Sequence, residues 1–199
     1  AALRAGARDI GMDAEAVRDV FPDGVADAIW NFSRLADQHM LAEMESADLD
    51  ELRIHERVAW AVETRLAFLE PHREAVHRGL TWLSLPQNVL LGTRLLYRTV
   101  DDIWYAVGDK SADFSFYTKR GLLAGVIGST MLCWLDDQSE DAAETTAFLH
   151  RRIADVMKIH GARKRIKSSR GRVFGSLAIL KDIVEKRYRL PDKGDSRVT

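Results

Sequence analysis

Residues 83–135 contain two long apolar segments joined by a short polar turn, and this arrangement constrains the fold more than any other feature. In the first segment, from Pro86 to about residue 107, large apolar side chains recur every three to four residues, the spacing of a helix face. Proline is well suited to a first helical position, so we expect this helix to start at Pro86. The residues 108–111 read as a stop and a turn. The second segment spans 113–136, and Asp113 can cap it.

Three glycines lie on one face of the second segment. Gly121, Gly125 and Gly128, with Ser129, are spaced at i, i+4, i+7 and i+8, which aligns them on a helix. Each interior glycine costs about 1 kcal/mol relative to alanine, so the row needs a structural or functional reason. Two interpretations stay open. Either a neighbouring helix approaches closely, or the face forms a groove for an apolar ligand.

The rest of the chain also favours helices, because no stretch alternates apolar and polar residues with the period of a strand. Short connections carry Gly and Pro. We expect an all-α fold with helices near 2–9, 13–20, 24–45, 50–69, 72–84, 86–107, 113–136, 140–160 and 170–189.

Charge is distributed unevenly although the net charge of the 199 residues is only −1. Residues 1–50 have four basic and eleven acidic side chains, a net charge of −7, whereas residues 150–199 have a net charge of +10. Polyanions are therefore expected to bind at the tail. The one cysteine, Cys133, lies in an apolar segment and is expected to be a packed core thiol in a reducing compartment.

The first 24 residues read as two short helices around a Gly-Met turn, with Asp13 as the cap of the second helix. This head resembles the DNA-binding head of TetR-type regulators. It differs at two positions: Gly24 replaces a phosphate-contacting lysine, and Arg18 replaces a tyrosine. Because DNA affinity depends on neutralising phosphates, this acidic head is expected not to bind nucleic acid. A ligand-responsive TetR-type transcription regulator is the alternative function.

A more specific resemblance covers most of residues 1–165 and is densest between 83 and 157. It resides in the segments Leu85-Pro86-Gln87-Asn88, Arg98-Thr99-Val100-Asp101-Asp102-Ile103-Trp104, 106–120, Ser139-Glu140-Asp141 and 148–157. These segments resemble the ninth Coq protein family of ubiquinone biosynthesis.

The resemblance implies a TetR-like all-α fold that is usually dimeric and no longer binds DNA. It implies an accessory protein that binds isoprenoid quinone precursors or other lipids and supports or presents substrate to a di-iron quinone hydroxylase. It also implies that the hydroxylase docks at Asp113, Phe116 and Tyr117, where Phe116 replaces a tryptophan common in the family. By helical spacing Tyr117 is expected to point inward with Phe114, and Phe116 elsewhere, either towards a partner or over the adjacent helix pair.

We expect an elongated apolar pocket between the helices at 86–107 and 113–136, roofed by the helix at 72–84. Few charges interrupt the interior stripe, which suits an acyl or isoprenoid chain rather than a polar substrate. The residues expected to contact the lipid are Leu83, Leu90, Leu95, Trp104, Gly121, Gly125, Ile127, Gly128 and Met131.

Patterns for catalysis are scarce. The chain has one Glu-x-x-His pair, Glu74 and His77, where a carboxylate-bridged di-iron site needs two pairs and two more glutamates. It has no Gly-x-Ser-x-Gly, dinucleotide or phosphate-loop motif. We expect no enzyme activity, no catalytic or metal-binding residue, and no cofactor other than a bound lipid or isoprenoid quinone.

The tail contains a basic run followed by an amphipathic pattern over 173–189. Such a segment suits an anionic membrane surface, although docking on its own domain or on a second subunit is the alternative. Family members use a terminal amphipathic helix at membranes, which favours the membrane interpretation. The residues expected to contact the membrane are Arg170, Arg172, Phe174, Leu177, Leu180, Lys181 and Val184.

The domain prediction has three parts: a degenerate helix-turn-helix head with its connecting helix (1–48), a lipid-binding and dimerisation domain (49–160), and a basic linker, amphipathic helix and tail (161–199). No apolar run reaches the ~18 residues that a membrane-spanning helix requires. The resemblance implies a homodimer, and with the basic tail we expect it to be peripheral on the inner membrane from the cytoplasmic side, or from the matrix side in a mitochondrion.

Overall fold

The computed structural model describes residues 2–13, 15–108 and 114–158, and its regular elements in these ranges are all helical. In chain order they are α1 (Ala2–Asp9), α2 (Ala16–Val20), α3 (Val25–Ser46), α4 (Ile54–Leu69), η1 (Glu70–His72), α5 (Arg73–Leu83), α6 (Val89–Ala106), α7 (Phe114–Asp136) and η2 (Glu140–Ala142). A further helix follows over 143–158. The expectation of an all-α fold is confirmed, whereas the helix expected at 170–189 lies outside the described residues.

Three predicted helix starts are wrong, and the simplest case is α4, which begins at Ile54 rather than near residue 50. The helix α6 begins at Val89 rather than Pro86, because residues 84–88 form a turn in which the Asn88 side chain donates to the Trp82 carbonyl at 2.9 Å. The helix α2 begins at Ala16, three residues after Asp13. The Asp13 carboxylate accepts the Glu15 backbone N–H at 3.0 Å, so it closes the preceding turn and does not cap α2.

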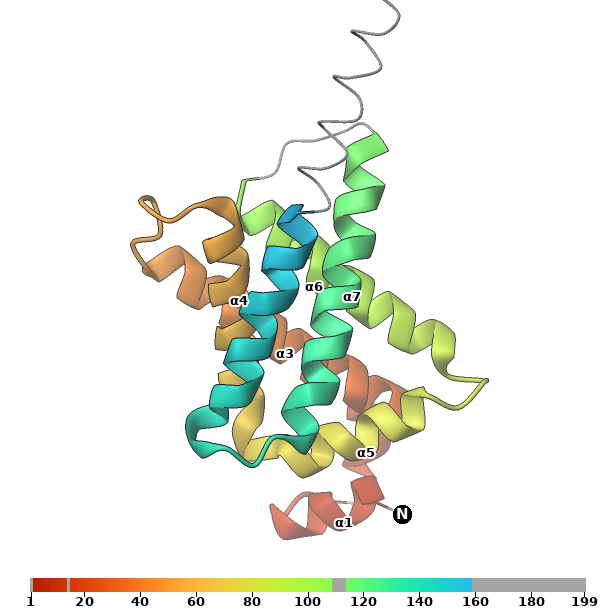
Figure 1. Ribbon diagram of the computed structural model, residues 1–199. Coiled ribbons are helices and arrows are strands. Elements are labelled where there is room, and N and C mark those ends of the chain that lie inside the picture. The colour runs from red at the N-terminus through yellow and green to blue at the C-terminus, as the bar shows by residue number, and fades with distance from the viewer. Residues whose placement is uncertain (1, 14, 109–113, 159–199) are drawn as a thin grey trace, which may run out of the picture. The chain divides into compact units, whose positions relative to one another are not determined.

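Residues 1–153 form one compact unit and residues 154–199 a second one. The described part of the second unit, 154–158, is helical. Within the first unit α3 packs against α4 and α6, and α6 packs against α7 (Figure 1). The interior between these helices holds large side chains from separate parts of the chain, among them Met40, Ile103, Trp134 and Leu149. Each such burial contributes about 1.5–3 kcal/mol to folding.

A buried ion pair lies inside this core. The Arg65 Nε on α4 donates to Asp37 Oδ1 on α3 at 2.8 Å, and the Thr99 hydroxyl on α6 donates to the same oxygen at 2.9 Å. Asp102 lies on α6, and burial, with the charge of Asp37, raises its pKa above the ordinary value. The three helices that form the core are thus joined by one polar contact as well as by apolar packing.

The helix α5 lies at the surface and has no buried residue. It nevertheless approaches its neighbours closely at two glycines. A Cβ placed on Gly92 of α6 would lie 3.4 Å from the Leu83 Cβ, and one on Gly79 would lie 3.9 Å from the Ile29 side chain. These contacts place the second half of α5 beside α3 and α6.

Candidate functional site

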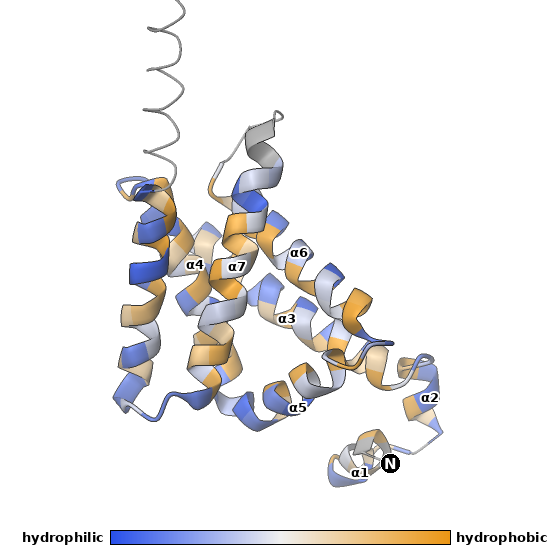
Figure 2. Cartoon of the chain, turned by 45° about the vertical axis from the view of Figure 1, so that its right-hand side comes forward, coloured by the Kyte–Doolittle hydropathy of each residue, from blue (hydrophilic) through white to orange (hydrophobic). Residues whose placement is uncertain are grey.

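The helix α7 has two unlike faces. One face is buried in the core and carries Leu123, Val126 and Trp134. The opposite face is open to solvent, where Tyr117 is 72% exposed and Leu132 is 67% exposed. No charged residue occurs between Arg120 and Asp136, so α7 shows no strongly hydrophilic turn along this length (Figure 2). A helix that is apolar all round is normally covered on every side, whereas this face of α7 is exposed within the described residues.

The glycines lie on this open face. A Cβ added at Gly121, Gly125 or Gly128 would meet no atom within 4 Å. Close approach by a neighbouring helix of the same chain is therefore wrong as an explanation for the row, at least within the described residues. The glycines leave free space along α7 between Tyr117 and Leu132.

Polar contacts join the beginning of α7 to α6. Arg120 donates from Nε and from a terminal nitrogen to Asp101 Oδ1, at 2.8 and 2.7 Å. The Lys119 ammonium lies 5.6 Å from the ring centroid of Trp104, a cation–π contact. These contacts place the start of α7 over the last turns of α6.

The structure does not bring the predicted lipid-contacting residues together around one space. Leu95 and Ile127 are buried in the core, whereas Leu90 is 71% exposed. Leu83, Trp104 and Met131 are half-buried, and the glycines face solvent. On α7, Ile127 and Gly125 differ by two residues and therefore point in divergent directions. Lipid contact at these residues stays a prediction.

A depression of about 400 Å³ lies elsewhere, between the end of α3, the start of α4 and the end of α6. Its wall includes Glu45, Asp48 and Asp50. Arg57 also lines it, and its guanidinium donates to the Asp50 carbonyl at 2.9 Å. None of the residues predicted to contact lipid lines this depression. Its acidic, open wall does not suit an apolar chain.

The predicted partner-facing residues are placed only in part. Tyr117 is largely exposed and does not point inward as expected. Asp113 and the side chain of Phe116 lie outside the described residues. The sequence analysis missed Tyr105 at the end of α6, which is 86% exposed. Tyr105 lies two residues after the buried Ile103, so it points to a different side of the helix. This spacing could have predicted its exposure from the sequence.

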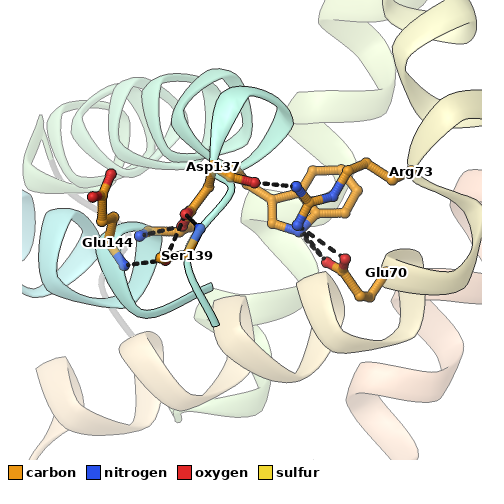
Figure 3. Close-up of polar contacts among 7 residues, drawn as sticks. Glu70, Arg73, Asp137, Ser139 and Glu144 are labelled. Carbon is orange, nitrogen blue, oxygen red and sulfur yellow. Dashed lines mark hydrogen bonds and ion pairs between the residues drawn. The ribbon is translucent and has the colours of Figure 1, made fainter. Parts of the chain in front are cut away.

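A polar cluster ties the other end of α7 to η1 (Figure 3). The Trp134 Nε1 donates to Glu70 at 2.6 Å, and Arg73 donates to Glu70 at 2.9 Å and also to the Asp137 carbonyl. The hydrogen bond from Arg73, followed by that from Trp134, lowers the pKa of Glu70. This cluster fixes the end of α7 beside the α4–α5 connection.

The Asp137 side chain then caps the helix at 143–158. Its carboxylate accepts hydrogen bonds from the Ser139 and Thr145 hydroxyls and from the backbone N–H groups of the same two residues. These bonds, those of Ser139 first, hold the pKa of Asp137 well below its ordinary value.

Neither a metal cluster nor a membrane span is found in the part of the chain that the structure describes. No three His, Cys, Asp or Glu residues there are grouped to hold an ion. No helix there is both long and apolar enough to cross a bilayer. The predicted membrane-contacting residues of the tail lie outside the described ranges.

Known proteins are similar to this chain in the region that contains α6 and α7. Residues 89–160, which cover α6, α7 and the capped helix, match the family model described as COQ9. A rat (Rattus norvegicus) protein named "Ubiquinone biosynthesis protein COQ9, mitochondrial" is 35% identical over 177 residues, 84% of this chain and 56% of that protein. The human (Homo sapiens) protein of the same name is 41% identical over 109 residues, 55% of this chain and 34% of that protein. The chain is thus related to the COQ9 family.

The chain spans a little over half the length of the rat COQ9 protein. Among solved structures, the TetR transcriptional regulator from Nitrosomonas europaea is similar, with a TM-score of 0.64 and 22% sequence identity. The match covers 76% of this chain and 83% of the regulator. The predicted TetR-like fold is confirmed, and the COQ9 match falls on the two-faced helix and its neighbours.

Proposed function

We propose that this chain is a lipid-binding accessory protein of ubiquinone biosynthesis. In this proposal it binds an isoprenoid quinone precursor or another lipid, and it supports or presents substrate to the di-iron quinone hydroxylase without catalysis of its own. The observation that carries the proposal is the open face of α7, where Gly121 and Gly125 leave free space between exposed apolar side chains. The COQ9 relationship supplies the pathway.

The chemistry of this face favours an apolar chain as the ligand. Fifteen consecutive residues, 121–135, carry no charge, so a charged substrate would find no ionic partner there. Covering apolar surface contributes about 25 cal/mol per Å², and an acyl or isoprenoid chain gains this energy along its full length. A polar head group is then expected towards the charged start of α7, near Lys119 and Arg120.

Native mass spectrometry of the purified full chain, followed by solvent extraction, tests the proposal. We expect adducts whose extracted molecules have a long acyl or isoprenoid chain. A protein that carries no lipid after gentle purification, and binds none when isoprenoid quinones are added, contradicts it. The same spectra give the oligomeric state, which we propose is a homodimer.

The tail and its location are a separate part of the proposal. Residues 163–189 are proposed to hold the protein on the inner face of an anionic membrane, because their clustered basic side chains each contribute about 1 kcal/mol near such a surface. Flotation of the full chain and of a form ending at residue 162 on anionic liposomes tests this. Equal flotation of both forms removes the tail from the proposal.

The TetR-type regulator is the second candidate, since the fold is shared with a regulator. The acidic head argues against it. Gly24, with a positive φ of 66°, precedes α3 and supplies no cation for a DNA phosphate. A gel shift with genomic fragments at low salt separates the two candidates, because only the regulator gives salt-sensitive, sequence-selective binding.

A further inference from the structure

The corner between α5 and α6 is an uncharged, projecting part of the molecule. Between Arg78 and Arg94, fifteen consecutive residues, 79–93, carry no charge, and they form the second half of α5, the turn and the first turn of α6. In Figure 1 this corner is the yellow to yellow-green bend that extends away from the packed helices at the right. We call residues 79–93 the corner segment.

The tip of the corner segment exposes large apolar side chains. Leu85 is 41% exposed, Val89 46% and Leu90 71%, and all three lie within one turn of the bend. Trp82 is half-buried just behind them. The cluster is convex and consists of three side chains, so it offers far less than the roughly 800 Å² per partner of a stable protein interface.

Four hydroxyl or amide side chains of the corner segment donate to nearby backbone carbonyls, whereas the exposed Gln87 makes none of these bonds. The Thr81 hydroxyl donates to the His77 carbonyl at 2.9 Å, and the Ser84 hydroxyl donates to the Thr81 carbonyl at 2.7 Å. The Thr93 hydroxyl donates to the Val89 carbonyl at 2.9 Å. In the bend itself, the Asn88 side chain donates to the Trp82 carbonyl at 2.9 Å. These bonds lower the desolvation cost of moving the four side chains into a water-poor layer.

The backbone of the bend is satisfied in the same way. The N–H groups of Ser84, Leu85, Asn88 and Leu91 each donate to a carbonyl within the corner segment, at 2.8–3.3 Å. A bend normally leaves such groups to water. These bonds reduce the number of backbone groups that need water when the turn enters lipid.

From these observations we propose that the corner segment inserts into the boundary between head groups and acyl chains of a lipid bilayer. Leu85, Val89 and Leu90 enter the apolar layer, with Trp82 at the interfacial depth that tryptophan prefers. Arg78 and Arg94 flank the segment at the level of the lipid phosphates. Arg78 also pairs with Glu74 at 2.7 Å, and both side chains are well exposed, so water and phosphate can reach this pair.

This contact does not rest on the function proposed above, although Leu83 and Leu90 of the corner segment are also among the residues predicted to contact the lipid ligand. It uses neither the glycine face of α7 nor the basic tail, and it needs no quinone and no hydroxylase. The corner segment gives the first unit of the chain a membrane contact of its own. It would place the body of the protein, rather than only its tail, against the bilayer.

A depth measurement tests the insertion directly. In a Cys133→Ala background, Leu90→Cys is labelled with an environment-sensitive fluorophore, and Tyr105→Cys at the other end of α6 is the matched control. The full chain is added to vesicles of phosphatidylcholine and phosphatidylglycerol that contain lipids with a quencher on the acyl chain. We expect blue-shifted, quenched emission at position 90 and unquenched emission at position 105.

A binding measurement with unlabelled protein complements it. Leu90→Glu is expected to weaken co-sedimentation with the same vesicles about tenfold. It removes a leucine that the lipid would bury and places a charge in the apolar layer. Gln38→Glu, at an exposed position on α3, adds the same charge away from the corner. Because Leu90 is exposed, the thermal midpoint of Leu90→Glu should equal that of the control.

Three results would overturn the proposal. The first is a failure of the depth measurement: the label at position 90 stays in water while the protein is bound to vesicles, or the labels at positions 90 and 105 are quenched alike. Equal vesicle binding by Leu90→Glu and Gln38→Glu is the second. The third is a label that is shielded without lipid in a species of doubled mass, because a second copy of the chain then covers the corner. None of these results affects whether the chain carries a lipid ligand.

Discussion

Arg65 on α4 and Asp37 on α3 form an ion pair at 2.8 Å inside the core, where the Arg65 side chain is only 10% exposed and that of Asp37 only 3%. Thr99 donates to the same carboxylate oxygen from α6. Three helices thus converge on one charge that water scarcely reaches. An isolated buried charge is costly, so the pair matters most when one partner is removed.

Arg65→Met is therefore expected to destabilise the fold by about 3–5 kcal/mol, because it leaves the Asp37 carboxylate buried without its cation. Urea denaturation gives this difference in the free energy of unfolding. The double variant Arg65→Met with Asp37→Leu should recover much of the loss. The exposed pair of Arg78 and Glu74 is the control, and Arg78→Met should cost less than about 1 kcal/mol. Equal losses at both arginines would contradict the buried-pair interpretation.

Asp137 should make the stability of the fold depend on pH. Its folded pKa is lowered by bonds from Ser139 and Thr145, so its contribution is complete above the unfolded pKa and is lost as pH falls through the folded pKa. At neutral pH, Asp137→Asn should lower the free energy of unfolding, and this difference should shrink below about pH 4. Asp136→Asn is the matched control, since Asp136 makes none of these bonds. Denaturation midpoints measured from pH 7 to pH 3 give both values, and a difference that does not change with pH contradicts the prediction.

Gly125→Leu tests the open face of α7. Because a Cβ there meets no atom within 4 Å, the leucine should fit without strain, and the thermal midpoint should stay the same or rise. It should nevertheless abolish lipid co-purification, because it fills the space proposed for the chain of the ligand. Ala67→Leu adds a leucine at an exposed position on α4 and should carry lipid like the unaltered protein. If Gly125→Leu retains the same lipid, the lipid lies elsewhere.

Tyr117 tests the proposed hydroxylase contact. Replacing Phe116 and Tyr117 together by lysine should weaken binding to the hydroxylase at least tenfold, roughly 1.4 kcal/mol or more. The thermal midpoint should change little, because Tyr117 is largely exposed. Tyr97→Lys, at a half-exposed position on α6, is the control for added charge. Surface plasmon resonance with immobilised hydroxylase measures the affinities, and a collapse of stability in the double variant would place Phe116 in the core.

Local pattern predicted the helices well because their apolar spacing is regular. The pair of helices around residue 108 follows from side chains that are close in sequence. The start of α6 at Val89 did not follow, since proline suits a turn as well as a first helical turn, and the Asn88 contact decides between them. The orientation of Tyr117 was also missed, because spacing gives the faces of a helix but not which face the core covers.

The site was less predictable than the fold for a related reason. The glycine row was found from sequence, but whether another helix fills it depends on packing between distant segments. The ties between Asp37 and Arg65 and between Glu70 and Trp134 join residues 28 and 64 positions apart, and no local pattern reports them. The lipid-contacting residues and the partner patch therefore stay predictions.

The cluster of Glu70, Arg73 and Trp134 affects what happens when the backbone is cleaved at the α5–α6 corner. It joins the segment before the α5–α6 corner to the segment after it, and the contact of Asp37 with Thr99 does the same in the core. A protease that cleaves at the exposed residues 85–87 would leave two fragments that are still held together across the α3–α6 interface. The corner is therefore the natural place to divide this protein into two separately made halves that reassemble.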